Sequence, residues 1–177
     1  MKALELIGRR SSHFTRVARM FAHEVGVEVT LVPVLDITSS ESATFAGNPA
    51  LKLPSLRTGD GLLVGTENLC RFFAEASPRE LRIVWPEQLH DVRARNANEL
   101  VWHAMAAQVQ WVFGTLVGKL PAENVYFVKG RAGFEGALRW LDENVGAVRA
   151  AMPERDVSLL EVALFCLVEH LTFRGTL

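Results

Sequence analysis

The sequence contains little that would indicate a membrane, secreted or nucleic-acid-binding protein. Its 177 residues carry 19 lysines and arginines against 20 aspartates and glutamates, and a net charge of −1 argues against a charge-driven grip on DNA or RNA. The longest apolar run, VALFCLV at 162–168, is far too short to span a bilayer. Glu5 interrupts the apolar N-terminus, so residues 1–10 do not read as a signal peptide. With two cysteines, Cys70 and Cys166, we expect a reducing, cytoplasmic location.

Several motifs of cofactor and metal chemistry are also missing. Gly59, Gly61 and Gly65 do not have the spacing of a dinucleotide fingerprint, and the sequence has no P-loop. The five histidines show no metal-ligand spacing with cysteine or with one another, so we expect no metal. No cysteine precedes the first predicted helix, which excludes a thioredoxin-type redox motif in its usual form.

The first half of the chain alternates between strand and helix patterns. The expected elements are a strand at 2–8, a helix at 11–25, a strand at 27–34, a short irregular helix within 36–49, a hairpin of strands at 52–56 and 62–64, and a helix at 66–77. The first three make a βαβ unit, which implies a parallel pair of strands. Pro54 cannot donate to a strand ladder, so its strand either lies at an edge or presents its backbone to a ligand.

The second half has no convincing strand pattern from Pro86 onward. Helical patterns cover residues 88–117, 133–152 and 158–173. Ser158 and Glu161 form a capping box at the start of the last helix, which is apolar nearly all round, so we expect it to be central. These patterns predict a first domain at 1–77, a linker at 78–88 and an all-helical domain at 89–177.

Four segments resemble the glutathione S-transferase family. They are SSHFTRVARM at 11–20, similar to the family's serine-led first helix; NPALKLPSL at 48–56, similar to the segment that leads to its cis-proline; LCRFFAE at 69–75, similar to its third helix; and SLLEVALFCLVEHLTFRG at 158–175, similar to the capped central helix of its second domain. The resemblance implies a thioredoxin-like N-terminal domain followed by an all-α C-terminal helical domain.

The resemblance also implies an activity, the conjugation of reduced glutathione to a small hydrophobic electrophile in detoxification. By register, Ser11 matches the family's active serine, and Ser12 is the adjacent candidate. A serine hydroxyl at a helix start can donate to a thiolate, and the helix N-terminus adds partial positive charge. Either serine can instead simply cap the helix. A non-catalytic glutathione-binding or interaction module is the alternative function, and a peroxidase or isomerase would use the same thiolate.

Glutathione contacts are implied at the hairpin. In the family, the proline that matches Pro54 is cis, and the residue before it, here Leu53, hydrogen-bonds the cysteinyl backbone of glutathione as an added strand would. Lys52 lies where the family places a polar contact to the tripeptide. An exposed strand lysine is the simpler reading of that residue.

The family binds the γ-glutamyl end of glutathione with an acidic residue followed by serine at the start of its third helix. An ungapped alignment places Gly65 and Thr66 there, and Gly65 cannot replace the acid. Thr66 can replace the serine as a cap and carboxylate donor. If the turn is one or two residues longer, Glu67 and Asn68 fill the two positions instead.

An electrophile pocket is expected near His13, Trp102 and His103, although such residues can equally belong to a core or an interface. The family continues for several tens of residues beyond its capped helix, whereas this sequence ends at Leu177. We therefore expect a shortened C-terminal domain, with a site that is open or covered by a partner subunit. The family pairs its subunits, so the expected assembly is a homodimer.

Overall fold

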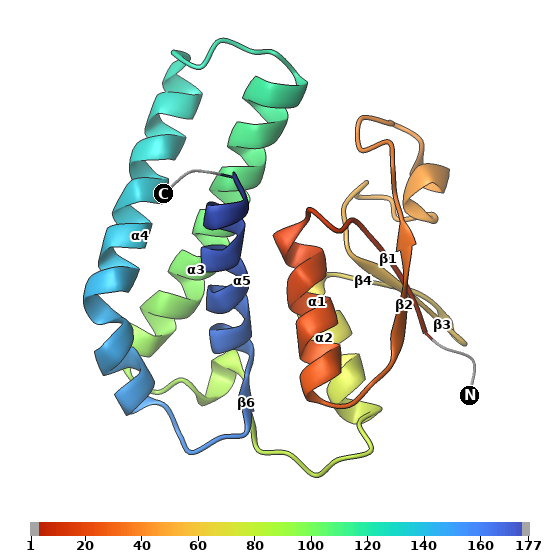
Figure 1. The fold of residues 1–177 in the computed structure, drawn as a ribbon, viewed down its shortest axis with the longest axis vertical. Coiled ribbons are helices and arrows are strands. Elements are labelled where there is room, and N and C mark those ends of the chain that lie inside the picture. Colours follow the sequence, from red (N-terminus) through yellow and green to blue (C-terminus); the bar gives the residue numbers. More distant parts are fainter. Residues whose placement is uncertain (1–3, 175–177) are drawn as a thin grey trace. The chain divides into compact units, whose positions relative to one another are not determined.

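The structure, a computed structural model, describes residues 4–174. Two compact units make up the chain: one joins the residues up to Ile83 with those from Arg155 onward, and the other spans Val84–Glu154. The first unit is a mixed sheet with helices packed on it, and the second is a helical hairpin (Figure 1). No helix among residues 4–174 is both long and apolar enough to cross a bilayer. The domain boundary at 78–88 stays a prediction.

A four-stranded sheet organises the first unit. Its strands are β1 (Leu4–Gly8), β2 (Val29–Pro33), β3 (Ser55–Thr58) and β4 (Gly61–Val64), in the spatial order β2-β1-β3-β4. β1 and β2 are parallel, as the βαβ pattern predicts, and β3 is antiparallel to both β1 and β4. Residues 2 and 3 of the predicted first strand lie outside the described residues.

Helix α1 (His13–Glu24) follows β1 and confirms the helix predicted from residue 11. Val17 and Phe21, spaced at one helical turn, are completely buried on its inner face. The helix begins at His13 because Ser12 acts as its N-cap. Gly26, with φ +76°, follows its end in a conformation that costs glycine least.

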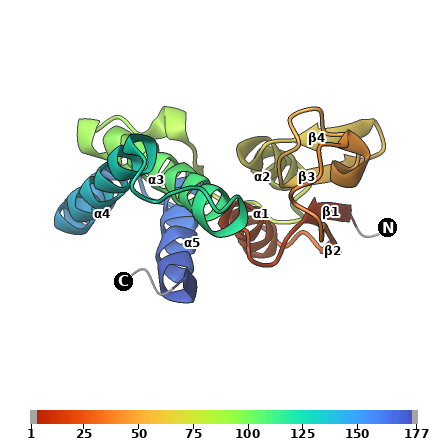
Figure 2. The ribbon, with the colours of Figure 1, turned by 90° about the horizontal axis from the view of Figure 1, so that it is seen from above.

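Helices lie on both faces of the sheet. Helix α2 (Thr66–Glu75) lies beside α1 on one face, α5 (Leu159–Arg174) packs on α1, and the 3₁₀ helix η1 (Ser42–Phe45) lies on the other face (Figures 1 and 2). The completely buried core between sheet and helices includes Leu6, Val17, Phe21, Leu56, Leu69 and Phe73. Ile7 instead belongs to a smaller cluster with Val34 and Phe45.

Helix α5 is less enclosed than the sequence predicts. Ser158 Oγ accepts a hydrogen bond from the Glu161 backbone N–H at 3.4 Å, so the predicted cap is present. The Glu161 carboxylate also accepts from the Arg155 guanidinium at 2.6 Å. The prediction that α5 is central is wrong for one side of the helix: Phe165, Val168 and Phe173 are about half exposed.

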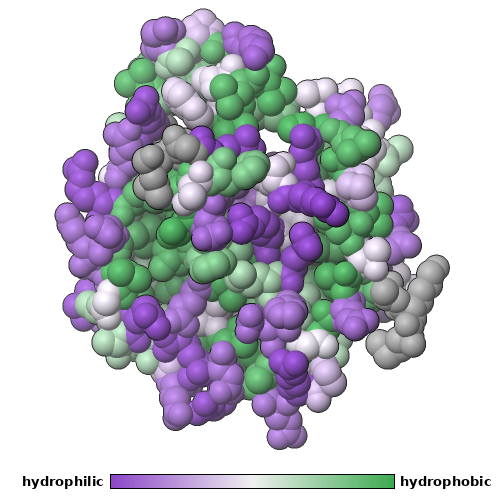
Figure 3. All heavy atoms as spheres, in the orientation of Figure 1, coloured by the Kyte–Doolittle hydropathy of each residue, from purple (hydrophilic) through white to green (hydrophobic). Residues whose placement is uncertain are grey.

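The second unit consists of α3 (Val92–Trp111), a π-helical extension η3 (Val112–Val117) and α4 (Val125–Ala151), after a short η2 (Pro86–Gln88). α3 and α4 pack on each other along the hairpin. Apolar side chains gather at the end where η3 leads to α4 (Figure 3), and the exposed ones include Phe113, Leu116, Leu120, Val125 and Tyr126.

The start of α4 differs from the predicted helix at 133–152. The helix begins eight residues earlier, at Val125, where Asn124 Oδ1 accepts from the Tyr126 backbone N–H at 3.0 Å. Glycines at 130 and 133 disfavour helix by about 1 kcal/mol each, which hides this part of the pattern. Packing offsets that cost, because Phe127 is buried and its ring contacts that of Trp111.

Two short strands fall where no strand is expected. β5 (Ile83–Val84) and β6 (Val157–Ser158) form a separate sheet of two residues each, too short to leave an alternating pattern. Asp156, next to β6, connects to Arg82, next to β5. Its carboxylate accepts from the Arg82 backbone N–H and guanidinium, both at 2.8 Å. These hydrogen bonds lower the Asp156 pKa to about 2, so the carboxylate stays charged at neutral pH.

Candidate functional site

Strands β1, β3 and β4 of the first unit have paired residues at the same end of the sheet. Ile7 of β1 is paired with Ser55 of β3, and Ser55 is paired with Val64 of β4. Gly8 follows Ile7, Pro54 precedes Ser55, and Gly65 follows Val64. These three residues therefore form a row at one end of the sheet. The segments that leave the sheet here are 9–12, 52–54 and 65–66, which include most of the predicted site residues.

Two helices begin at this end of the sheet. α1 starts five residues after Gly8, and α2 starts directly after Gly65. A helix N-terminus carries unpaired backbone N–H groups and a partial positive charge, so it favours an anionic ligand. The predicted serines and the predicted glutathione contacts thus share an edge that suits thiolate and carboxylate groups.

The two adjacent serines have different surroundings. Ser12 Oγ accepts a hydrogen bond from the Thr15 backbone N–H at 3.3 Å and so caps α1. Ser11 Oγ instead accepts from Arg9 Nε at 3.1 Å. Both serine residues are half-buried. Ser12 therefore has an assigned structural role, whereas the hydroxyl of Ser11 lies beside a cation.

His170 of α5 holds the backbone of the serine segment. Its Nε2 lies 3.1 Å from the Ser11 carbonyl oxygen, which can only accept, so the ring donates. Burial and, to a smaller extent, the positive charge of Arg174 together lower the pKa of His170 to about 4. His170 is therefore neutral at neutral pH and ties the Ser11 segment to α5.

Pro54 precedes its strand. The Leu53–Pro54 peptide bond is cis, and β3 begins at Ser55. The predicted strand at 52–56 is thus wrong for its first three residues, because proline has no N–H for the ladder. Leu53 packs against the Ile7 cluster, and Lys52 is exposed.

Asn48 shapes this segment and was not predicted as a site residue. It is 3% exposed, and its Nδ2 donates to the Lys52 carbonyl at 2.8 Å and to Ser55 Oγ at 3.3 Å. Its Oδ1 accepts from the Ala50 backbone N–H at 2.9 Å. One amide thus closes the loop that carries Leu53 and Pro54. The Asn-Pro pair was visible in the sequence, but its long-range partners were not.

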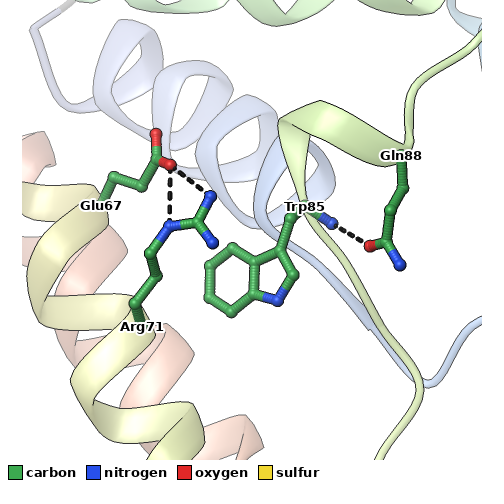
Figure 4. Close-up of polar contacts among 4 residues, drawn as sticks. All are labelled: Glu67, Arg71, Trp85 and Gln88. Carbon is green, nitrogen blue, oxygen red and sulfur yellow. Dashed lines mark hydrogen bonds and ion pairs between the residues drawn. The ribbon is translucent and has the colours of Figure 1, made fainter.

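Helix α2 begins at the two residues that the ungapped alignment selects. Gly65 is the N-cap, with φ +92°, and Thr66 is the first helical residue. Glu67 and Asn68 lie inside the first turn, and their role in binding glutathione stays a prediction. The Glu67 carboxylate accepts from Arg71 at 2.7 Å (Figure 4), and Asn68 Nδ2 donates to the Val64 carbonyl at 3.0 Å.

Gly65→Asp, compared with Gly65→Ala, tests whether this site lacks an acid. A Cβ at Gly65 meets only ordinary contacts, so both variants carry the backbone strain of a positive φ, about 1–3 kcal/mol, and both lower the Tm. If glutathione binds here as the family resemblance implies, aspartate alone adds a carboxylate for its ammonium group, worth up to about 1 kcal/mol, or a fivefold gain in affinity over alanine. Calorimetric titration of both variants measures this difference. Equal affinities would show that the ammonium group does not lie near residue 65.

The predicted electrophile-pocket residues lie in different units. His13, the first residue of α1, is completely buried, and its ring contacts those of Phe14 and His170 at centroid distances of 4.8 and 4.3 Å. Trp102 is half-buried and His103 exposed, both on α3 of the second unit. Their role in an electrophile pocket stays a prediction.

Neither cysteine is suited to thiolate chemistry. Cys70 and Cys166 are both completely buried. Burial raises the pKa of the Cys70 thiol far above its usual range and that of Cys166 to about 11. Within residues 4–174, no cluster of three histidine, cysteine, aspartate or glutamate side chains could hold a metal ion.

A cleft of about 560 Å³ lies away from the row of strand ends. Its lining comes from the C-terminal part of α1, the start of β2 and one residue of α5, and includes Arg19, His23, Thr30 and Cys166. Pro33, at the other end of β2, is the residue paired with Gly8. The cleft therefore does not coincide with the serine segment, and we place the candidate site at the strand ends on chemical grounds.

Comparison with known proteins agrees with this arrangement. Residues 6–81 match the sequence profile described as the N-terminal domain of glutathione S-transferase. A comparison with curated protein sequences finds no match.

Solved structures with the same fold include bacterial and human proteins. A glutathione S-transferase from Methylobacillus flagellatus KT with glutathione bound is 21% identical, with a TM-score of 0.73 over 98% of this chain and 85% of the other. A glutathione transferase family member from Pseudomonas fluorescens Pf-5 with bound glutathione is also 21% identical, with a TM-score of 0.76 over 97% and 84%. Human glutathione transferase theta-2 is 21% identical, with a TM-score of 0.64 over 94% and 71%.

A thioredoxin-like sheet with a cis-proline at the strand ends, followed by a helical hairpin and a capped helix, defines the class of protein. The chain has the glutathione S-transferase fold, and its residues 6–81 match the N-terminal domain of that family. The predicted fold class is therefore confirmed, and the match over residues 6–81 supports the predicted family.

Proposed function

We propose that this protein is a glutathione transferase that conjugates reduced glutathione to a small hydrophobic electrophile. The row of Gly8, Pro54 and Gly65 carries the proposal, because it joins the serine segment, the Leu53–Pro54 segment and the N-terminus of α2 at one edge. Leu53 binds the cysteinyl backbone through its main chain, and Lys52 adds a polar contact at the edge. The N-terminus of α2, with Thr66, takes the γ-glutamyl carboxylate.

Ser11 is the residue we propose to stabilise the thiolate. A free thiol has a pKa of about 8.5, and lowering it by two units requires about 2.7 kcal/mol of preference for the charged form. A hydrogen bond to a charged group is worth about 1.5–3 kcal/mol, so one hydroxyl with the dipole of α1 is sufficient. The thiolate then forms a bond to the electrophilic carbon, and the leaving group departs with its electron pair. Ser12 remains the adjacent candidate, with its capping role as the simpler reading.

A conjugation assay with a nitro-activated aryl chloride tests this activity. We expect the initial rate to saturate with glutathione and to rise with pH as the bound thiol ionises, because the thiolate is the nucleophile. The absorbance of the aryl thioether product measures the rate. A folded protein that gives no rate above the buffer blank at several millimolar glutathione would contradict the proposal.

A non-catalytic glutathione-binding or interaction module is the second candidate. Gly65 favours it, because a residue without a side chain stands where the family has an acid. Glutathione binding without turnover of any electrophile would support this reading. The homodimer, the cytoplasmic location and a role in detoxification, which the family resemblance implies, stay predictions.

A further inference from the structure

Arg9 reaches across the candidate site from the end of β1. Its Nε donates to Ser11 Oγ at 3.1 Å, and its Nη1 donates to the Leu35 carbonyl at 3.1 Å. Leu35 follows β2, so the guanidinium bridges two segments that leave the sheet at the same end. Two acceptors on different segments fix the direction of the side chain, which is half-buried. The neighbouring Arg10 is exposed.

The chemistry of this contact determines what Ser11 can do. A guanidinium has no acceptor and is always charged, whereas a hydroxyl has one donor hydrogen and two acceptor lone pairs. A hydroxyl that accepts from Arg9 must direct its own hydrogen elsewhere. Accepting from a cation also polarises the O–H bond and makes it a stronger donor.

We infer that Arg9 is a positioning residue, which holds the Ser11 hydroxyl as a donor toward the sulfur of bound glutathione and so raises the thiolate fraction. The inference rests on the proposed function. A positioning role differs from direct binding of a glutathione carboxylate by Arg9. Direct binding would change the affinity for glutathione and would not change the pKa of its thiol. A positioning role also differs from a structural role, which would change stability alone.

The test uses the full chain with Arg9→Ala, Arg9→Lys and the matched control Arg10→Ala. The ultraviolet absorbance of the thiolate, titrated against pH at saturating glutathione, gives the apparent pKa of the bound thiol. We expect Arg9→Ala to raise that pKa by about one unit, because the Ser11 hydroxyl then loses the contact that orients and polarises its O–H bond as a donor to the sulfur. We expect Arg9→Lys, which keeps the charge, to recover part of the shift, and Arg10→Ala to match the wild type.

A double-mutant cycle with Ser11→Ala shows whether Arg9 acts through the serine. If it does, Arg9→Ala adds less than a twofold change in kcat to the Ser11→Ala variant, because coupled residues are not additive. A full, additive effect in that background would overturn the inference, as would an Arg9→Ala variant whose thiol has the wild-type pKa. If Arg9→Ala does not fold, the Arg9→Lys titration and its cycle with Ser11→Ala decide in the same way.

The outcomes separate this inference from the proposed function. A wild-type protein that binds glutathione without any thiolate signal overturns both. A wild-type thiolate signal that is unchanged in the Arg9 variants overturns the role of Arg9 and leaves the transferase proposal standing. A change in KM for glutathione with an unchanged thiol pKa assigns Arg9 to a carboxylate and also overturns the inference.

Discussion

Replacing Ser11 by alanine is expected to lower the conjugation rate at pH 6.5 by about 10- to 100-fold. The variant removes the hydroxyl that we propose as donor to the sulfur, so the pKa of the bound thiol rises by about one to two units toward its free value. At pH 9 the thiol ionises without help, and the difference between variant and wild type should shrink to a few-fold. The pH dependence of kcat for both proteins measures this convergence.

Ser12→Ala is the matched comparison. Ser12 Oγ accepts from the Thr15 backbone N–H, so its loss removes a helix cap and costs about 1 kcal/mol of stability. For a chain of this size, that lowers the Tm by about 2–4 °C. If Ser12→Ala raises the thiol pKa and Ser11→Ala does not, the thiolate donor is Ser12 and our assignment is wrong.

Asn48→Ala is expected to destabilise the protein by about 2–4 kcal/mol. The substitution removes one buried side chain that bonds the Lys52 carbonyl, Ser55 Oγ and the Ala50 N–H. Each buried group left without a partner costs about 1–3 kcal/mol, and groups on the exposed side of the loop cost less because they can hydrogen-bond water. Denaturant unfolding gives the stability change. Glutathione binding should weaken as well, because the segment with Leu53 and Pro54 loses its anchor.

Asn144→Ala provides the control for an asparagine with a local partner. Asn144 Nδ2 donates to the Trp140 carbonyl within helix α4 and is half-buried. Its replacement should change stability by no more than about 0.5 kcal/mol. Alanine favours a helix, and the Trp140 carbonyl still lies within the hydrogen-bonded backbone of α4. If Asn48→Ala behaves like Asn144→Ala, the loop does not depend on the Asn48 amide.

Most elements of the first unit follow from local patterns in the sequence. The helical spacing of Val17 and Phe21 with Gly26 at the end predicts α1, and the apolar runs around the turn at 58–61 predict the hairpin of β3 and β4. These features depend on residues within a few positions of one another. The position of Ser11 and Pro54 at one end of the sheet also follows once the βαβ and hairpin order is known.

Other features depend on partners distant in the sequence. Asn48 was missed because burial of a polar side chain depends on the fold around it. The Arg9–Ser11 contact depends on the conformation of the Arg9 side chain, which also donates to the Leu35 carbonyl. The start of α4 was missed because packing on α3 outweighs the cost of two glycines. The acid–serine register could not be chosen from the sequence, since it depends on where β4 ends and α2 begins.

Calorimetric titration of the wild-type protein with reduced glutathione at neutral pH measures whether the protein binds the tripeptide at all. We expect saturable binding with a Kd at or below about 1 mM, which corresponds to about −4 kcal/mol. That result would show that the protein binds the tripeptide although Gly65 supplies no acid. A folded protein that shows no binding at several millimolar glutathione would contradict the proposed transferase function, and an interaction module would then be the better assignment.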